Sequence, residues 1–102
     1  MGNGVGPQPG YGFRPGGSHS KLNLSAATVI KATPGTVFRV NVTTAGTTAG
    51  SISDCLTTGA VAPANLIATI PDVVGQYDVT FPALVGIVFT PGTGMVASIS
   101  YA

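Results

Sequence analysis

Residues able to perform acid–base or nucleophilic chemistry are scarce in this sequence. Its 102 residues include three aspartates, no glutamate, one histidine and one cysteine. A carboxylate pair must converge on one pocket, whereas Asp72 falls in a turn and Asp78 on the polar face of an expected strand. A nucleophilic pair of Cys55 with His19 would join a thiol expected to be buried to a Gly-rich segment. The sequence therefore predicts a protein that is not an enzyme.

The remaining motifs predict no bound cofactor, metal ion or nucleic acid. A single cysteine builds neither an intrachain disulfide nor a thiolate zinc site, and free cysteine is most often a small buried hydrophobe. Glycines 2, 4 and 6 resemble the start of a phosphate-binding loop, but no strand precedes them and no helix follows. Four Lys/Arg residues and a net charge of +1 form no basic patch for nucleic acid. No segment approaches the roughly 18 apolar residues of a membrane-spanning helix, so no membrane partner is expected.

The first part of the chain is too poor in apolar surface to order itself. Its first twenty residues include seven glycines and three prolines. Ordering twenty residues costs roughly 20–40 kcal/mol, whereas burying Tyr11 and Phe13 returns about 4–6 kcal/mol each. We therefore expect residues 1–21 to form an extended Gly/Pro-rich docking arm that orders on a partner, and residues 22–102 to form the folded domain.

The arm also carries the residues expected to dock on that partner. Tyrosine and arginine are enriched at the energetic centres of protein interfaces. The expected docking residues are Val5, Tyr11, Phe13 and Arg14. The alternative is a solvated arm that happens to contain aromatic side chains. Only 7% of all residues are charged, and near-zero net charge promotes association, so we expect the protein to be part of an assembly and to bind copies of itself.

From Lys21 onward, short β-type segments alternate with Gly/Pro turns. Strands are expected at residues 28–32, 36–43, 51–56, 65–70, 75–81, 86–90 and 95–101. About seven strands at intervals of roughly eight to twelve residues are typical of an antiparallel β-sandwich or a small jelly-roll-like barrel. No window shows helical periodicity with caps, so we expect an all-β fold with at most a short turn at residues 59–64.

Alternation along three strands predicts which side chains face the core. In residues 36–43 the inner face is expected to carry Phe38, Val40 and Val42, with Val37 on the opposite face. In residues 75–81 the inner positions are Tyr77, Val79 and Phe81. In residues 95–101 they are Met95, Ala97, Ile99 and Tyr101, with Ser98 and Ser100 outside.

The amino-acid sequences of these strands and turns resemble those of a known class of viral proteins. The segments concerned are KATPGTVFRVNV, TTAGTTAGSISD, LIATIPDVVGQYDVTFP, GIVFTPGTG and VASISYA, which lie within residues 31–102. They are similar to the small β-sandwich structural proteins of tailed bacteriophages and prophages. The resemblance rests on the sequences of the strands and turns and does not include the arm. It assigns no functional residue to this chain.

The resemblance implies a virion role, and we expect a capsid decoration (cement) protein. Such a protein would bind the major capsid protein or other virion proteins of the assembled shell, in particles assembled in the host bacterial cytoplasm. The alternative is a tail, baseplate or fibre component that binds host glycans. Aromatic platforms suit glycans, and the domain's aromatic residues are mostly expected in the core. A secreted adhesin or pilus-like subunit is a third class, disfavoured because the first twenty residues lack an apolar signal segment.

Overall fold

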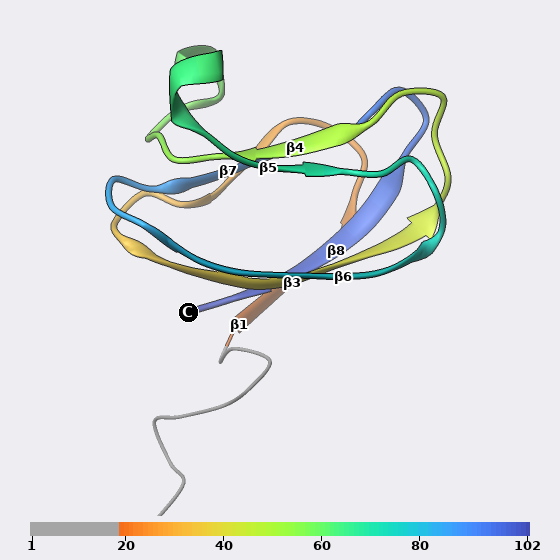
Figure 1. Ribbon diagram of the computed structural model, residues 1–102, viewed down its shortest axis with the longest axis horizontal. Helices are drawn as coiled ribbons and strands as arrows, with labels where there is room; N and C mark the ends of the chain where they lie inside the picture. Colours follow the sequence, from red (N-terminus) through yellow and green to blue (C-terminus); the bar gives the residue numbers. More distant parts are fainter. Residues whose placement is uncertain (1–18) are drawn as a thin grey trace, which may run out of the picture.

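Two four-stranded antiparallel sheets pack face to face (Figure 1). The structure is a computed structural model and describes residues 19–102. One sheet has the strand order β1-β8-β3-β6 and the other the order β2-β7-β4-β5. The strands are β1 (His19–Leu24), β2 (Thr28–Lys31), β3 (Gly35–Thr44), β4 (Gly50–Ser53), β5 (Leu66–Ile70), β6 (Gly75–Ala83), β7 (Ile87–Thr90) and β8 (Val96–Tyr101). The expected all-β sandwich is confirmed, with eight strands in place of about seven.

The additional strand is β1, which begins inside the range assigned to the arm. It pairs with β8 from His19 to Leu24, with a bulge after Lys21 that places Asn23 at a φ of 57°. Asparagine tolerates this left-handed conformation better than most residues. Only Leu24 of this strand is buried, because β1 is an edge strand. A strand with one buried side chain leaves little periodic signal in the sequence, which is why its first three residues were assigned to the arm.

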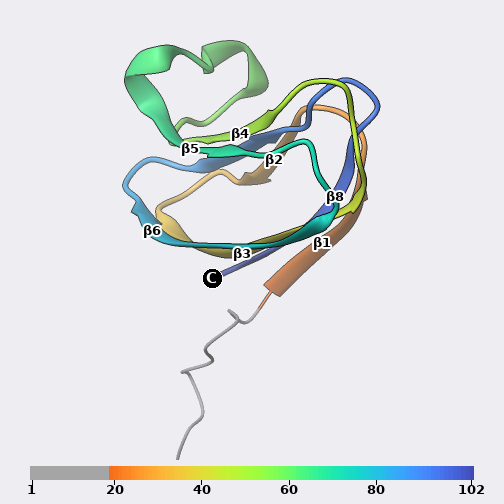
Figure 2. The ribbon, with the colours of Figure 1, turned by 45° about the vertical axis from the view of Figure 1, so that its right-hand side comes forward.

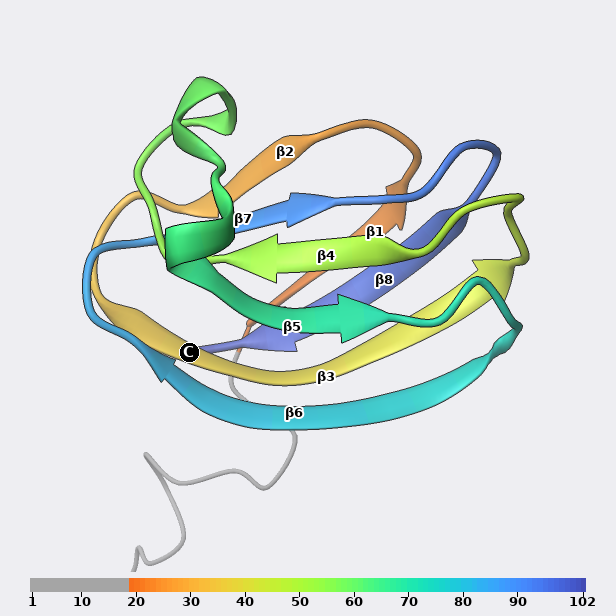
Figure 3. The same cartoon turned by 45° about the horizontal axis from the view of Figure 1, so that its top comes forward.

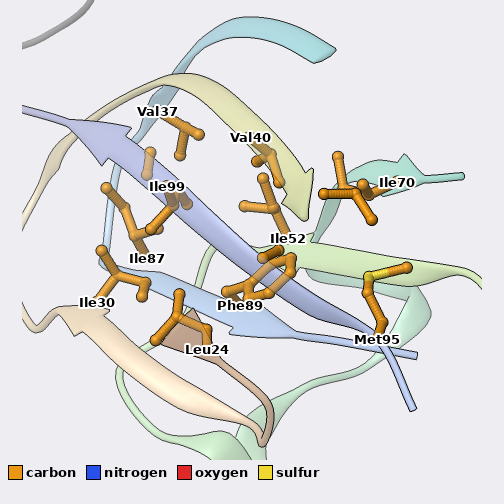
Figure 4. Packing of buried hydrophobic residues seen from close by; sticks show 13 residues of the cluster. Leu24, Ile30, Val37, Val40, Ile52, Ile70, Ile87, Phe89, Met95 and Ile99 are labelled. Carbon is orange, nitrogen blue, oxygen red and sulfur yellow. The ribbon is translucent and has the colours of Figure 1, made fainter. Parts of the chain in front are cut away.

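The core lies between the sheets and is made of aliphatic side chains around Phe89 (Figure 4). β8 alternates as expected, since Ala97 and Ile99 are buried and Ser98 and Ser100 lie outside. Ile52 of β4 and Phe89 of β7 are paired in register and both fully buried. Burial of each such side chain contributes about 1.5–3 kcal/mol. This cluster therefore supplies most of the hydrophobic stabilisation of the sandwich.

On β3 and β6, the side chains that are buried differ from those expected. β3 carries one extra residue relative to β8 between Val37 and Arg39, so Val37 is fully buried and Phe38 only partly. On β6, Thr80 has a φ of 46° and Phe81 is 50% exposed. A bulge inserts one extra residue, and on β3 it reverses the alternation between Val37 and Val40. The assignment of Phe38 to the core was therefore wrong, because it assumed an uninterrupted strand. The assignment of Phe81 was also wrong: this residue pairs with the buried Val37, but it lies on the edge strand β6 and stays half exposed.

The connection between β4 and β5 lies on the outer side of the second sheet (Figures 2 and 3). It contains two 3-10 turns, η1 (Thr58–Ala60) and η2 (Pro63–Asn65), where one short turn was expected. The Asn65 side chain holds the connection together by accepting from Ala62 N at 3.0 Å and donating to Ala60 O at 2.9 Å. Ser53 and Val88 on this side of the sheet are fully buried.

Candidate docking surface

One carboxylate joins the connections at one end of the sandwich. Asp54 directly follows β4, and its carboxylate accepts three backbone hydrogen bonds from the β6–β7 turn. The donors are Leu84 N at 2.9 Å, Val85 N at 2.8 Å and Gly86 N at 3.1 Å. Asp54 N donates to Asn65 O at 2.8 Å. A single residue therefore ties together the ends of β4, β5 and β6.

The same hydrogen bonds decide the charge of Asp54. Partial burial acts to raise the pKa of this carboxyl, but the three backbone donors outweigh it and lower the pKa below its ordinary value. Donors directed at a carboxylate favour its charged form. Asp54 is therefore ionised at neutral pH and accepts charge-assisted hydrogen bonds, which are stronger than neutral ones.

Around this carboxylate lies a group of exposed apolar side chains, which we call the apolar end. Their exposed fractions are 49% for Leu56, 48% for Leu66, 75% for Leu84 and 45% for Val85. Leu84 and Val85 belong to the turn held by Asp54, and Leu66 pairs with Ser53 of β4. A group of large apolar side chains on a fixed backbone is typical of a protein-interaction site.

The opposite end of the sandwich is built differently, and we call it the crossed-loop end. Here the β3–β4 loop (45–49) and the β7–β8 loop (91–95) are joined by Thr47 N donating to Thr93 O and Thr93 N donating to Thr48 Oγ1, both at 2.8 Å. A Cβ on Gly92 would collide with the carbonyl of Thr48. Exposed Val73 and Val74 lie in the nearby β5–β6 turn.

The outer face of the first sheet carries a shallow groove of about 90 Å³. Its floor is β8 and its sides are β1 and β3. Its lining residues are Ser20, Leu22, Arg39, Asn41, Ser98, Ile99 and Ser100. Beside it, Arg39 Nε donates to Asp78 Oδ1 at 2.9 Å. Both partners are exposed, so the pair contributes no more than about 1 kcal/mol.

The docking residues predicted from the sequence, Val5, Tyr11, Phe13 and Arg14, lie outside the described residues. The residues considered for catalysis have separate surroundings. Asp78 pairs with Arg39, the His19 ring lies 5.6 Å from that of Tyr101, and the Cys55 thiol donates to Thr57 O at 3.4 Å. Among residues 19–102, no three His, Cys, Asp or Glu side chains are grouped to hold a metal ion.

Sequence reasoning missed the apolar end, although a signal for it exists. Asp54 interrupts the alternation of an expected strand, and an aspartate after a strand commonly accepts hydrogen bonds from turn N–H groups. The turn Leu84-Val85-Gly86 has two large apolar residues where turns usually carry polar ones. What the sequence does not reveal is that these two segments, thirty residues apart, meet.

Comparisons with protein-family models, curated proteins and solved structures find no match to this chain, and none links it to the virion proteins that its sequence resembles. Within residues 19–102, no helix has the length and apolar character needed to cross a membrane.

Proposed function

We propose that this protein is a non-enzymatic virion structural protein, a capsid decoration protein that binds the assembled shell. The observation that supports a docking role is the apolar end, where Asp54 fixes a backbone that exposes Leu84 and Val85. The virion setting rests on the sequence resemblance alone. In this proposal the apolar end contacts the shell, and the N-terminal segment, with Val5, Tyr11, Phe13 and Arg14, adds a second contact.

The free energies of burial and of association indicate why the protein needs two contacts with the shell. Full burial of a leucine or valine yields about 1.5–3 kcal/mol, so burying the exposed fractions of the four side chains of the apolar end yields roughly 3–6 kcal/mol. Association costs an estimated 4–15 kcal/mol in lost translational and rotational freedom. The apolar end alone therefore binds weakly. A second, tethered contact converts weak binding into firm attachment through its effective concentration.

The Asp54 hydrogen bonds reduce the entropic cost of docking. A loop that is already fixed before binding loses less conformational freedom than a mobile one. Three N–H groups of the β6–β7 turn are held by one ionised carboxylate. The turn therefore presents Leu84 and Val85 in a preset arrangement, as a docking surface requires.

The proposed mechanism is stabilisation by mass action. A protein that binds the assembled shell but not its free subunits shifts the equilibrium toward the shell. Because only 7% of its residues are charged, the attachment is expected to depend on apolar contact and to be insensitive to salt. No catalytic step is involved.

The test compares two exposed apolar positions at opposite ends of the sandwich. Leu84→Ser lies at the apolar end, and Val73→Ser at the other end is the matched control, since its side chain is 59% exposed. Each full-length variant is mixed with undecorated shells and co-sedimented. We expect Leu84→Ser to weaken binding about tenfold or more, and Val73→Ser to bind like the parent. Equal binding by both variants would contradict the proposal.

A tail, baseplate or fibre role with glycan binding is the second candidate, and one observation favours it. Phe81 was expected in the core but is half exposed, and an exposed aromatic ring can support a sugar face. Electron microscopy of labelled particles separates the two roles by locating the protein on the shell or on the tail. Loss of glycan binding in Phe81→Ser would support the second candidate over the first.

A further inference from the structure

The groove on the outer face of the first sheet has the composition of a site for one amphipathic ring. Its floor is formed by β8, where Ser98 and Ser100 point outward. On one side stands Leu22 of β1, which is 71% exposed, and on the other stand Arg39 and Asn41 of β3. The groove is shallow and its volume, about 90 Å³, is on the scale of one side chain.

Arg39 determines which kind of side chain fits. Its Nε donates to Asp78 Oδ1 at 2.9 Å, and 38% of the Arg39 side chain stays exposed beside the groove. A guanidinium attracts the face of an aromatic ring. Leu22 offers apolar contact to the same ring, and the serine hydroxyls and Asn41 offer hydrogen bonds to a polar tip. Tyrosine combines an apolar ring with such a tip.

We propose that the groove binds Tyr11 of the same chain. Glycines flank this residue on both sides in Gly10-Tyr11-Gly12, and residues without a Cβ allow the backbone to approach a sheet closely. The N-terminal residues lead directly into β1, whose Ser20 and Leu22 line the groove. The nine residue steps from Tyr11 to Ser20 span at most about 30 Å. The intervening Pro15-Gly16-Gly17 has the sequence of a tight turn, which allows the chain to reverse.

The tether favours the chain's own tyrosine over that of a second copy. A short flexible linker gives an effective concentration on the order of millimolar, so a weak contact between one ring and the groove is sufficient. Bound in this way, Tyr11 anchors the N-terminal segment on the outer face of β1, β8 and β3. Tyr11 would then bind the groove in place of the partner, and the second contact proposed above would be made by Val5, Phe13 and Arg14. This inference does not depend on the virion role.

The test uses the isotopically labelled full-length protein and amide resonances in solution. Tyr11→Ala removes the proposed ligand, and Val5→Ala is the control in the same segment. We expect Tyr11→Ala to shift the amides of Ser98 and Ser100, with no change at Ser51 on the other sheet. We expect Val5→Ala to leave all three unchanged. Unmoved Ser98 and Ser100 amides in Tyr11→Ala would overturn the proposal.

A second variant changes the groove instead of its proposed ligand. Ser98→Leu places a larger side chain on its floor, and we expect the heteronuclear NOE of residue 11 to fall to that of residues 3–6. An unchanged NOE would contradict the assignment. The shifts between Tyr11→Ala and the parent should also be independent of protein concentration. If they disappear on dilution together with a change from dimer to monomer mass, the ring comes from a second copy and the proposal for the same chain is wrong.

Discussion

The two ends of the sandwich are stabilised in opposite ways. At the crossed-loop end, two loops exchange hydrogen bonds through Thr47, Thr48 and Thr93 and leave no room for a Cβ on Gly92. At the apolar end, one carboxylate holds the turn, and four large apolar side chains remain partly exposed. The loops of the crossed-loop end are closed by backbone packing, with two exposed valines, Val73 and Val74, in the adjoining turn, whereas the apolar end exposes four large side chains beside a turn fixed by Asp54.

Because the two ends are built differently, substitutions at one end should affect the stability of the fold and substitutions at the other should affect docking. Substitutions within the two joined loops of the crossed-loop end should destabilise the fold without changing the apolar end. Substitutions of the exposed side chains at the apolar end should change docking with little loss of stability. Asp54 lies between these cases, since it stabilises the fold and also shapes the exposed turn.

The largest stability effect is expected for Gly92→Ala at the crossed-loop end. The new Cβ would overlap the backbone carbonyl of Thr48, and relief requires movement of two hydrogen-bonded loops. Such overpacking costs about 3 kcal/mol. Gly59→Ala is the matched control, because a Cβ there has no atom within 4 Å. Denaturant unfolding measures both, and equal midpoints would show that the loops are not packed as described.

A smaller loss is expected for Asp54→Ala. Three N–H groups of the β6–β7 turn lose their acceptor, and since the site is partly open to water the cost is about 2 kcal/mol. Hydrogen exchange should accelerate at residues 84–86 and stay unchanged at residues 91–94. Asp72→Ala, in the turn at the opposite end, is the control. Uniform acceleration at both ends would argue against a local role.

The pH dependence follows from the lowered pKa of Asp54. A carboxyl whose folded pKa lies below its unfolded value near 3.9 contributes stability that is present above about pH 4. This contribution is lost as the pH falls through the lower folded pKa. Unfolding free energies measured between pH 7 and pH 2 should fall more steeply for the parent than for Asp54→Asn. Parallel curves would show that Asp54 does not titrate as inferred.

The smallest stability effect is expected for Leu84→Ser at the apolar end. This side chain is the most exposed of its group, and surface substitutions usually change stability by less than about 0.5 kcal/mol. The unfolding midpoint should stay near that of the parent while docking is weakened. A loss above about 2 kcal/mol would instead place Leu84 among the residues that stabilise the fold.

Much of the fold could be predicted from the sequence because β-periodicity and turn residues agree over most of the chain. The alternation of Ala97, Ile99, Ser98 and Ser100 is a clear example. One failure occurs where an extra residue reverses the alternation. The extra residue of β3 between Val37 and Arg39 places Val37 in the core and Phe38 only partly buried, and no residue pattern in β3 predicts it.

The candidate site could not be predicted in the same way. It depends on contact between Asp54 and the turn at residues 84–86, which only the strand order brings together. Composition indicates that the chain has few charged groups, but it does not show which leucines stay exposed. Leu24 lies between Asn23 and Ser25 and is buried, whereas Leu84 lies between Ala83 and Val85 and is exposed, so the polarity of the sequence neighbours does not predict burial.

The most direct test of the docking surface is electron cryomicroscopy of purified particles that carry the protein. The measurement is which end of the sandwich meets the neighbouring subunit. We predict that residues 54–66 and 84–86 lie against the partner, with Leu84 covered and Gly92 facing solvent. A map in which the crossed-loop end makes the contact and Leu84 stays exposed would contradict the account.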